Sequence, residues 1–302
     1  MPGGVADERV APRWFRWPGR VVRATLDDVV TTLYPTDCDT CGRPLLRFGL
    51  APVCEECVDG VLPQSMTRCR LCGEALDMEG VRYAGQFPVE GLVCSPCRMV
   101  PPPFERAVAY AVYSDELREM IHLLKYERMR TVAKPLGRFL ARAIETLEGE
   151  AGTEILVVAV PLFPSKERQR GYNQAVLLAQ AAMAELKRSK PAWKLLEAHG
   201  AIQRVKDTRS QFELTPKGRR RNLQGAFAAG AASVAGREVL LVDDIYTTGA
   251  TARECARVLR RAGASKVWVA TVSRAQPEMV AAWDAEVRSG VESNENLTRC
   301  KQ

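Results

Sequence analysis

The sequence predicts an α/β fold, with a mostly parallel sheet covered by helices and a cysteine-rich module on its N-terminal side. Two observations predict it. After residue 103, short runs rich in Val, Ile and Leu alternate with amphipathic stretches of helical period, a pattern typical of parallel strands buried between helices. Before that point, eight of the ten cysteines fall between residues 38 and 97, which marks a second kind of structural unit.

The composition is that of a globular protein and excludes a membrane-spanning one. Of the 302 residues, 46% are hydrophobic and 26% are charged, and the length suggests two domains or one large domain with an attachment. No run approaches the ~18 apolar residues of a membrane helix. Residues 1–30 hold five arginines and no apolar leader core. We therefore expect a cytoplasmic protein, in which clustered cysteines ligate metal rather than form disulfides.

Residues 1–34 are expected to form a basic arm and a short amphipathic helix that Pro35 ends. The arm and helix carry aromatic and apolar residues at Trp14, Phe15, Trp17, Val22, Leu26, Val29 and Leu33. Aromatic residues beside arginines suit base stacking and phosphate contacts with a single nucleic-acid strand. They can equally dock the arm on its own domain, and the pattern leaves both readings open.

Residues 35–103 are predicted to form a module with two zinc sites. The eight cysteines form four C-x-x-C pairs: Cys38/Cys41, Cys54/Cys57, Cys69/Cys72 and Cys94/Cys97. A two-residue gap lets one tight turn direct both thiolates at one ion, and two pairs complete the tetrahedral site that suits zinc. Because four protein ligands leave no position for water, both sites are expected to be structural.

The spacing of the cysteine pairs leaves alternatives open. Consecutive pairs can share an ion, or the pairs can interleave, the first with the third and the second with the fourth. A redox-active C-x-x-C or an iron–sulfur cluster is the alternative to zinc. The module serves either as a folded platform or as a grip on nucleic acid or a partner protein.

Three consecutive prolines at 101–103 form a stiff spacer, and residues 104–275 are expected to form the α/β domain. Buried strands are predicted over residues 107–113, 154–160, 237–242 and 266–272, and helices over 115–125, 133–147, 172–187 and 251–262. Residues 276–302 lose their apolar period around Ser289 and are expected to form a partly disordered tail.

The most informative segment is residues 239–251, Val-Leu-Leu-Val-Asp-Asp-Ile-Tyr-Thr-Thr-Gly-Ala-Thr. Its apolar residues predict a central strand, and ligands of open α/β sheets bind where such strands end. Asp243 and Asp244 are expected to stand about one sugar ring from a phosphate, where they accept hydrogen bonds from vicinal hydroxyls and help to hold Mg²⁺. The following loop predicts a monophosphate cradle of amides and hydroxyls from Thr247, Thr248, Gly249, Ala250 and Thr251.

Other phosphate loops do not fit this segment. No Lys follows the last glycine, so it is not a Walker A loop, and the G-x-G-x-x-G fingerprint of dinucleotide sites is absent. The alternative is an acidic strand end that precedes an ordinary capped helix.

Two basic segments are expected to neutralise phosphates beside that loop. A loop after the strand over 154–160 presents Lys166, Arg168 and Arg170 against a single acid, which suits a diphosphate. Residues 204–221, which include Arg219, hold seven basic and two acidic residues and are predicted to be a mobile flap that closes over a phosphorylated ligand. The two segments contribute +2 and +5, which equals the net charge of +7. A solvated basic face is the alternative.

The apolar strand, Asp-Asp and Thr-Thr-Gly-Ala-Thr together resemble the phosphoribosyl-pyrophosphate motif of type I phosphoribosyltransferases. With the C-x-x-C pairs added, the chain resembles the ComF family of amidophosphoribosyltransferase-like competence proteins. Three further stretches carry the resemblance: Ile-His-x-Leu-Lys-Tyr at 121–126, Val-Pro-Leu through Arg-Gly-Tyr-Asn-Gln at 160–174, and the Arg, Lys, Thr, Gln and Asn positions of 204–227. It extends from Tyr34 to about Arg274, and the arm and tail lie outside it.

That resemblance implies a sheet of the type I phosphoribosyltransferase kind and a ligand, phosphoribosyl pyrophosphate with Mg²⁺. The enzymatic hypothesis is that a nucleophile displaces diphosphate from the ribose through an oxocarbenium-like transition state. The resemblance also implies a part in natural competence and DNA uptake, with single-stranded DNA and a helicase-like ATPase as partners. The alternative is a salvage-type phosphoribosyltransferase acting on a small-molecule base, with a purely structural zinc module.

Overall fold

The computed structural model describes residues 36–45, 52–76, 91–207, 218 and 222–276. Their centre is a five-stranded sheet of order β3-β9-β8-β4-β5, in which every neighbouring pair is parallel. The strands are β3 (Arg106–Val112), β4 (Glu154–Ala159), β5 (Lys194–Glu197), β8 (Glu238–Tyr246) and β9 (Lys266–Arg274). The predicted parallel α/β fold is confirmed, with β8 in the middle.

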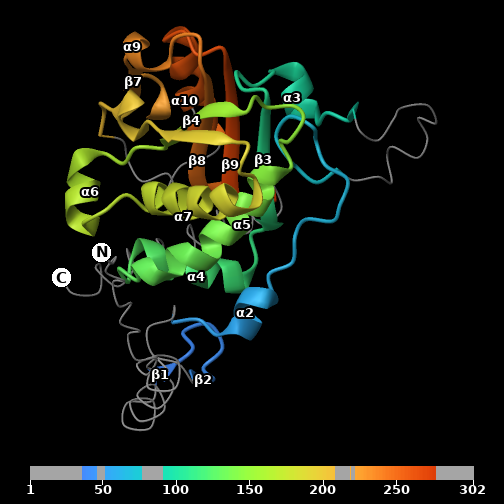
Figure 1. The fold of residues 1–302 in the computed structure, drawn as a ribbon, viewed down its shortest axis with the longest axis vertical. Helices are drawn as coiled ribbons and strands as arrows, with labels where there is room; N and C mark the ends of the chain where they lie inside the picture. The colour runs from blue at the N-terminus through green and yellow to red at the C-terminus, as the bar shows by residue number, and fades with distance from the viewer. Residues whose placement is uncertain (1–35, 46–51, 77–90, 208–217, 219–221, 277–302) are drawn as a thin grey trace, which may run out of the picture.

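Helices bury both faces of this sheet (Figure 1). One face is covered by α4 (Asp115–Lys125), α5 (Ala133–Glu145) and α7 (Gln174–Ser189), and the other by α10 (Ala250–Arg261). Side chains along a strand alternate between faces. On β8, Leu240 and Val242 pack into the first core, whereas Val239 and Leu241 pack into the second. This two-sided burial explains why the strand reads as a continuous apolar run.

Shorter elements connect the main strands and helices. A two-stranded antiparallel ribbon joins β6 (Ile202–Arg204) to β7 (Phe227–Ala229), and α9 (Ala231–Val234) follows it. The helix α6 (Pro164–Arg170) begins with a proline at its first position and ends at Gly171, whose φ of 82° is left-handed. Two 3₁₀ turns, η3 (Arg130–Val132) and η4 (His199–Ala201), complete the described elements that follow residue 103.

The N-terminal module divides between two places on the domain. Strands β1 (Thr36–Asp37) and β2 (Pro44–Leu45) form a small antiparallel pair near α2 (Glu55–Asp59). Figure 1 shows these three elements beyond α4, whereas α3 (Ser95–Met99) lies beside β3. Residues of the part around β1, β2 and α2 pack into the core on the α4 and α5 face. The part that includes α3 contributes its four cysteines to the core on the α10 face.

The predicted elements agree with the structure except in three respects. The loop predicted at 166–170 is wrong, because these residues form α6. The strand predicted to end at 242 runs on to Tyr246, because it continues to pair with β9 as far as Arg274. Short elements that lack a strong apolar pattern were not predicted, namely the strands β1, β2, β5, β6 and β7 and the helices α2, α3 and α9.

Several predictions fall on parts of the chain that the structure does not describe. These are the arm and helix of residues 1–34, the tail beyond 276, and most of the basic flap at 204–221, including Arg219. The division into domains at 34, 103 and 275 stays a prediction. No helix among the described residues is long and apolar enough to cross a membrane.

Candidate functional site

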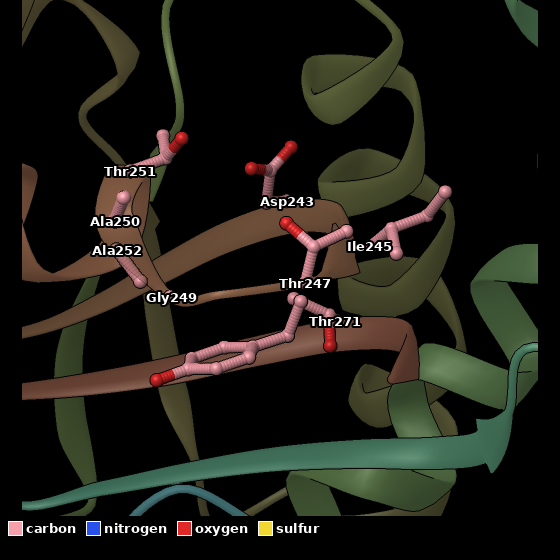
Figure 2. A pocket seen from close by; sticks show the side chains of 9 residues that line it. Asp243, Ile245, Thr247, Gly249, Ala250, Thr251, Ala252 and Thr271 are labelled. Carbon is pink, nitrogen blue, oxygen red and sulfur yellow. The ribbon is translucent and has the colours of Figure 1, made fainter. Parts of the chain in front are cut away.

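The β8–α10 connection forms one wall of a small open pocket at the carboxyl end of the central strand (Figure 2). Nine residues line it: Asp243, Ile245, Tyr246, Thr247, Gly249, Ala250, Thr251, Ala252 and Thr271. Four of the five residues predicted to cradle a phosphate are among them, and so is one of the two predicted acids. Thr248 is not in the lining, but its Oγ1 accepts a hydrogen bond from the Ala250 N–H, at 3.4 Å.

Gly249 is required in this loop for two reasons. Its φ of 71° is left-handed, a conformation that costs other residues about 1–2 kcal/mol. A Cβ on Gly249 would also lie 2.1 Å from the hydroxyl oxygen of Tyr246. The turn at Gly249 starts α10 at Ala250, and the first N–H groups of a helix have no partner within it. The loop thus directs partial positive charge at the pocket, which favours an anion.

The two adjacent acids lie inside β8, so their side chains point to opposite faces of the sheet. Asp243 lines the pocket, and Figure 2 shows its carboxylate on the same side of the strand as Thr251. Asp244 lies on the other face, where it is buried. Its Oδ1 accepts from Nζ of Lys125 at 2.8 Å and its Oδ2 accepts from Nε2 of Gln174 at 2.9 Å.

The acid pair has an unusual proton equilibrium. Burial and the neighbouring charge of Asp244 together raise the pKa of Asp243 to about 7, although Lys125 opposes the increase. Burial alone would lower the pKa of Lys125, but the charge and hydrogen bond of Asp244 outweigh burial and raise it. Asp243 therefore changes its charge near neutral pH, while the cation that faces the pair stays charged.

The residues predicted to bind a diphosphate do not lie together in the pocket lining. Lys166 and Arg168 are exposed on α6, and the described pocket lining includes neither of them nor Arg170. Arg170 is half-buried, lies 5.4 Å from the ring centroid of Tyr126, and donates to Oε1 of Gln174. Because Gln174 also binds Asp244, Arg170 is linked to the acid pair through one side chain. Arg219 lies outside the described residues.

Three further residues join the site: Thr271 and Gln174, which were not predicted as its ligands, and Lys125, which was expected either to reach the ligand or to end its helix. Thr271 lies on β9 within an apolar run, and nothing in the sequence marks it. Lys125 is the last residue of α4 and reaches Asp244 on β8, 119 residues later in the sequence. Gln174 belongs to the Arg-Gly-Tyr-Asn-Gln run at 170–174. That run was the sequence feature that could have identified Gln174 as a site residue, since a buried polar side chain needs a hydrogen-bond partner.

The eight cysteines form two clusters in sequential pairing. In the first, Cys38, Cys41, Cys54 and Cys57 place their sulfurs within 4.8 Å of one another, and Cys69, Cys72, Cys94 and Cys97 do so in the second. The interleaved pairing is therefore excluded. No C-x-x-C pair is a disulfide, because all eight thiols are free.

The sulfur spacing fits zinc. A metal–sulfur distance of ~2.3 Å gives a tetrahedron whose edges are about 3.8 Å. The sulfurs of Cys38 and Cys57 are 3.9 Å apart, those of Cys41 and Cys54 are 3.7 Å apart, and Cys72 and Cys94 are also 3.7 Å apart. A hydrogen bond from Arg43 lowers the pKa of the Cys41 thiol to about 6, which favours a thiolate ligand. Both clusters can bind zinc.

Comparisons with known proteins agree with this architecture. The model of the phosphoribosyl transferase domain family matches residues 175–301. The chain is 32% identical over 239 residues to the DNA utilization protein YhgH of Salmonella typhimurium, a match that covers 78% of this chain and 95% of that protein. It is 29% identical to competence protein F of Haemophilus influenzae (76% and 93% covered) and 26% identical to competence protein ComFC of Streptococcus pneumoniae (53% and 64% covered).

Proposed function

Because the chain belongs to the ComF family of proteins with a phosphoribosyltransferase domain, we propose that it binds phosphoribosyl pyrophosphate with Mg²⁺ and handles single-stranded DNA during competence and DNA uptake. The observation that carries the ligand assignment is the pocket at the end of β8. There, an ionisable carboxylate of Asp243 and the turn at Gly249 face one cavity. The DNA assignment rests on the names of the relatives, which refer to DNA utilization and competence.

The pocket suggests a place for each part of the ligand. The 5-phosphate would lie against Thr247, Thr251 and the first amides of α10, and the ribose hydroxyls would donate to Asp243. Asp244 would act indirectly, by positioning Lys125, because its two oxygens already accept hydrogen bonds from Lys125 and Gln174. The sequence had instead suggested that both acids contact the ribose directly.

The diphosphate would extend toward the exposed Lys166 and Arg168 and the half-buried Arg170, with Arg219 added from the flap. A bound Mg²⁺ would supply charge neutralisation there, and carboxylate oxygens are ligands that it accepts. In a transfer reaction, the protein residues would hold the nucleophile, the anomeric carbon and the leaving diphosphate in line, and they would stabilise the charge that develops on the diphosphate. Phosphoribosyl transfer is thus a proposed activity whose acceptor is a nucleophile presented at the same edge.

A second candidate is a salvage-type transferase that acts on a small-molecule base. One observation favours it, namely the packing of both cysteine clusters into the cores of the domain, as expected for purely structural zinc sites. The two candidates differ in whether single-stranded DNA competes for or modulates the ligand site. A released diphosphate in the presence of a free base would favour this candidate.

Calorimetry of the zinc-loaded full chain with phosphoribosyl pyrophosphate and Mg²⁺ tests the ligand assignment. We expect binding by the native protein and at least tenfold weaker binding by Asp243→Asn, which keeps the shape but loses the charge. Asp115→Asn is the matched control, because Asp115 is an exposed carboxylate on α4. Equal affinity of the Asp243 variant and the native protein would refute the assignment.

A further inference from the structure

The second cysteine cluster contacts the strand that flanks the pocket. Arg274, the last residue of β9, is 4% exposed. Its Nη2 lies 3.7 Å from the sulfur of Cys72 and donates to Oε2 of Glu74 at 3.3 Å. The same guanidinium lies over the ring of Tyr246, with its carbon 4.5 Å from the ring centroid. One buried side chain therefore touches a metal ligand and a pocket residue.

Tyr246 passes this contact on to the phosphate loop. Its buried ring also packs edge-on against Phe104, with the centroids 6.4 Å apart. The Tyr246 hydroxyl lies so close to Gly249 that a Cβ there would be 2.1 Å from it. The Tyr246 ring therefore packs directly under the left-handed turn at Gly249 and supports it. If the ring moved, the turn would lose this packing contact.

A second arginine links the cluster to the helix that follows the loop. Arg253 lies in the first turn of α10, and its Nη2 is 3.5 Å from the sulfur of Cys97. Its Nη1 donates to the carbonyl oxygen of Val100 at 2.9 Å. The backbone N–H of Arg253 donates to the carbonyl of Gly249 at 2.9 Å, so the same residue closes the first turn after the loop.

The geometry of the second cluster explains why these contacts depend on metal. A zinc ion would hold its four sulfurs in one tetrahedron, and the sulfurs of Cys72 and Cys97 contact Arg274 and Arg253. Without the ion, nothing ties the four sulfurs to one centre, so both arginine contacts lose their fixed position. Emptying the site would therefore release Arg274, which packs over the ring of Tyr246.

The first cluster offers a contrast. Among the described residues, the arginine that contacts it is Arg43, which is exposed and donates to the sulfurs of Cys41 and Cys54. Cys38 and Cys57 pack with the core of the α4 and α5 face, whereas all four cysteines of the second cluster share a core with Tyr246 and Ala250. The two chemically equal sites are therefore placed unequally with respect to the pocket.

We propose that the second metal site is the support of the phosphate-binding loop, with Arg274 and Arg253 as positioning residues, and that the first site has no such role. Metal occupancy at Cys69, Cys72, Cys94 and Cys97 sets whether the loop holds a phosphorylated ligand. This rests on the proposed function for the identity of the ligand, but the coupling between metal and loop does not.

The test compares zinc-loaded native protein with Arg274→Gln, Arg274→Lys and the matched control Arg43→Gln, which removes the arginine of the first cluster. Hydrogen exchange over residues 246–253 reports the loop without any ligand. We expect protection there to fall at least tenfold in Arg274→Gln, to recover in part in Arg274→Lys because the charge returns, and to stay unchanged in Arg43→Gln. Affinity for phosphoribosyl pyrophosphate with Mg²⁺ should follow the same order.

The outcomes separate the two proposals. Failure of the native protein to bind the ligand, together with loss of loop protection in Arg274→Gln, would refute the proposed function and leave the coupling standing. Native binding with unchanged protection and affinity in Arg274→Gln would refute the coupling. If Arg274→Gln does not retain two zinc ions, stepwise chelation of the native protein decides, with cysteine alkylation showing which cluster has emptied. Protection over 246–253 should persist until the second cluster is empty, and its loss with the first cluster would overturn the proposal.

Discussion

Lys125 and Asp244 form a buried ion pair, with 2.8 Å between Nζ and Oδ1, although 119 residues separate them in sequence. Their side chains are only 14% and 6% exposed, so neither charge is well solvated. The pair joins the end of α4 to the carboxyl end of β8 and places a cation near Asp243, the acid that lines the pocket. The pair therefore stabilises the packing of α4 against β8, and its lysine opposes the rise in the pKa of Asp243.

Removing the lysine should destabilise the protein more than removing both partners. Lys125→Met leaves Asp244 as an uncompensated buried charge, and we expect a loss of about 3–5 kcal/mol in the free energy of unfolding. The double change Lys125→Met with Asp244→Asn should recover part of that loss. Urea unfolding of the single and double variants measures both, and a double variant less stable than Lys125→Met would contradict this account.

Ligand affinity should rise as the pH increases through about 7, the pKa to which burial raises the carboxyl of Asp243. Because the ionised carboxylate is the proposed acceptor for the ribose, binding at pH 8 should be about tenfold tighter than at pH 6. Calorimetry at the two pH values measures the change. Asp243→Asn should show a nearly flat profile, and an equally steep one would assign the dependence to another group.

The same carboxyl has the opposite effect on stability. Its folded pKa of about 7 lies above the ordinary value of 3.8, so the folded state binds more protons between these limits. Its contribution to stability is therefore present in acid and is lost as the pH rises toward 7. Relative to Asp243→Asn, the native protein should lose stability across this window, as measured by urea unfolding at pH 5 and pH 7.5. If the native protein instead became more stable relative to Asp243→Asn between pH 5 and pH 7.5, that result would contradict the raised pKa.

Gly249→Ala should abolish ligand binding through a collision as well as through backbone strain. The added Cβ meets Tyr246, so the loop must move to accept it. Gly236→Ala is the matched control, because Gly236 has the same φ of 71° but open space around its Cα. Both variants should lose about 1–2 kcal/mol of stability from the left-handed backbone. Only Gly249→Ala should lose affinity for phosphoribosyl pyrophosphate, and equal loss in both would exclude the collision.

The sequential pairing of cysteines predicts how zinc content responds to paired substitutions. Cys38→Ser with Cys57→Ser should leave one zinc per chain, because both residues belong to the first cluster. Cys38→Ser with Cys94→Ser should leave none, because it disrupts both clusters. Elemental analysis of the purified variants distinguishes these results. A native content well below two zinc ions per chain would refute the double site.

Single-stranded DNA binding, if it uses α6, should show a salt dependence that shrinks when basic residues are removed. Each phosphate contact contributes about 0.7 to the slope of log affinity against log salt for a single strand. Lys166→Ala and Arg168→Ala should each reduce the slope by about that amount. Lys187→Ala, at the exposed end of α7, is the control and should leave it unchanged. An unchanged slope in the α6 variants would place the DNA elsewhere.

Local sequence was sufficient for the elements whose ends are set by local contacts. The helix predicted over 115–125 has those bounds in the structure, because the Ser114 side chain accepts from the Leu117 N–H and caps it. The predicted start of α7 differed by two residues, because Asn173 caps the helix that begins at Gln174. The loop at residues 247–251 could likewise be predicted from the sequence, since a left-handed Gly before a helix is a local requirement.

The sequence by itself thus determined the parallel α/β fold, the eight clustered thiols and the Asp-Asp and Thr/Gly segment, because each depends on residue type and short-range spacing. Only the tertiary structure decided which cysteine pairs share a site, which acid faces the pocket, and which residues reach it from afar. Lys125, Gln174 and Arg274 meet their partners across 70 to 202 residues. Such contacts form only when separate helices and strands pack together, so no local pattern encodes them.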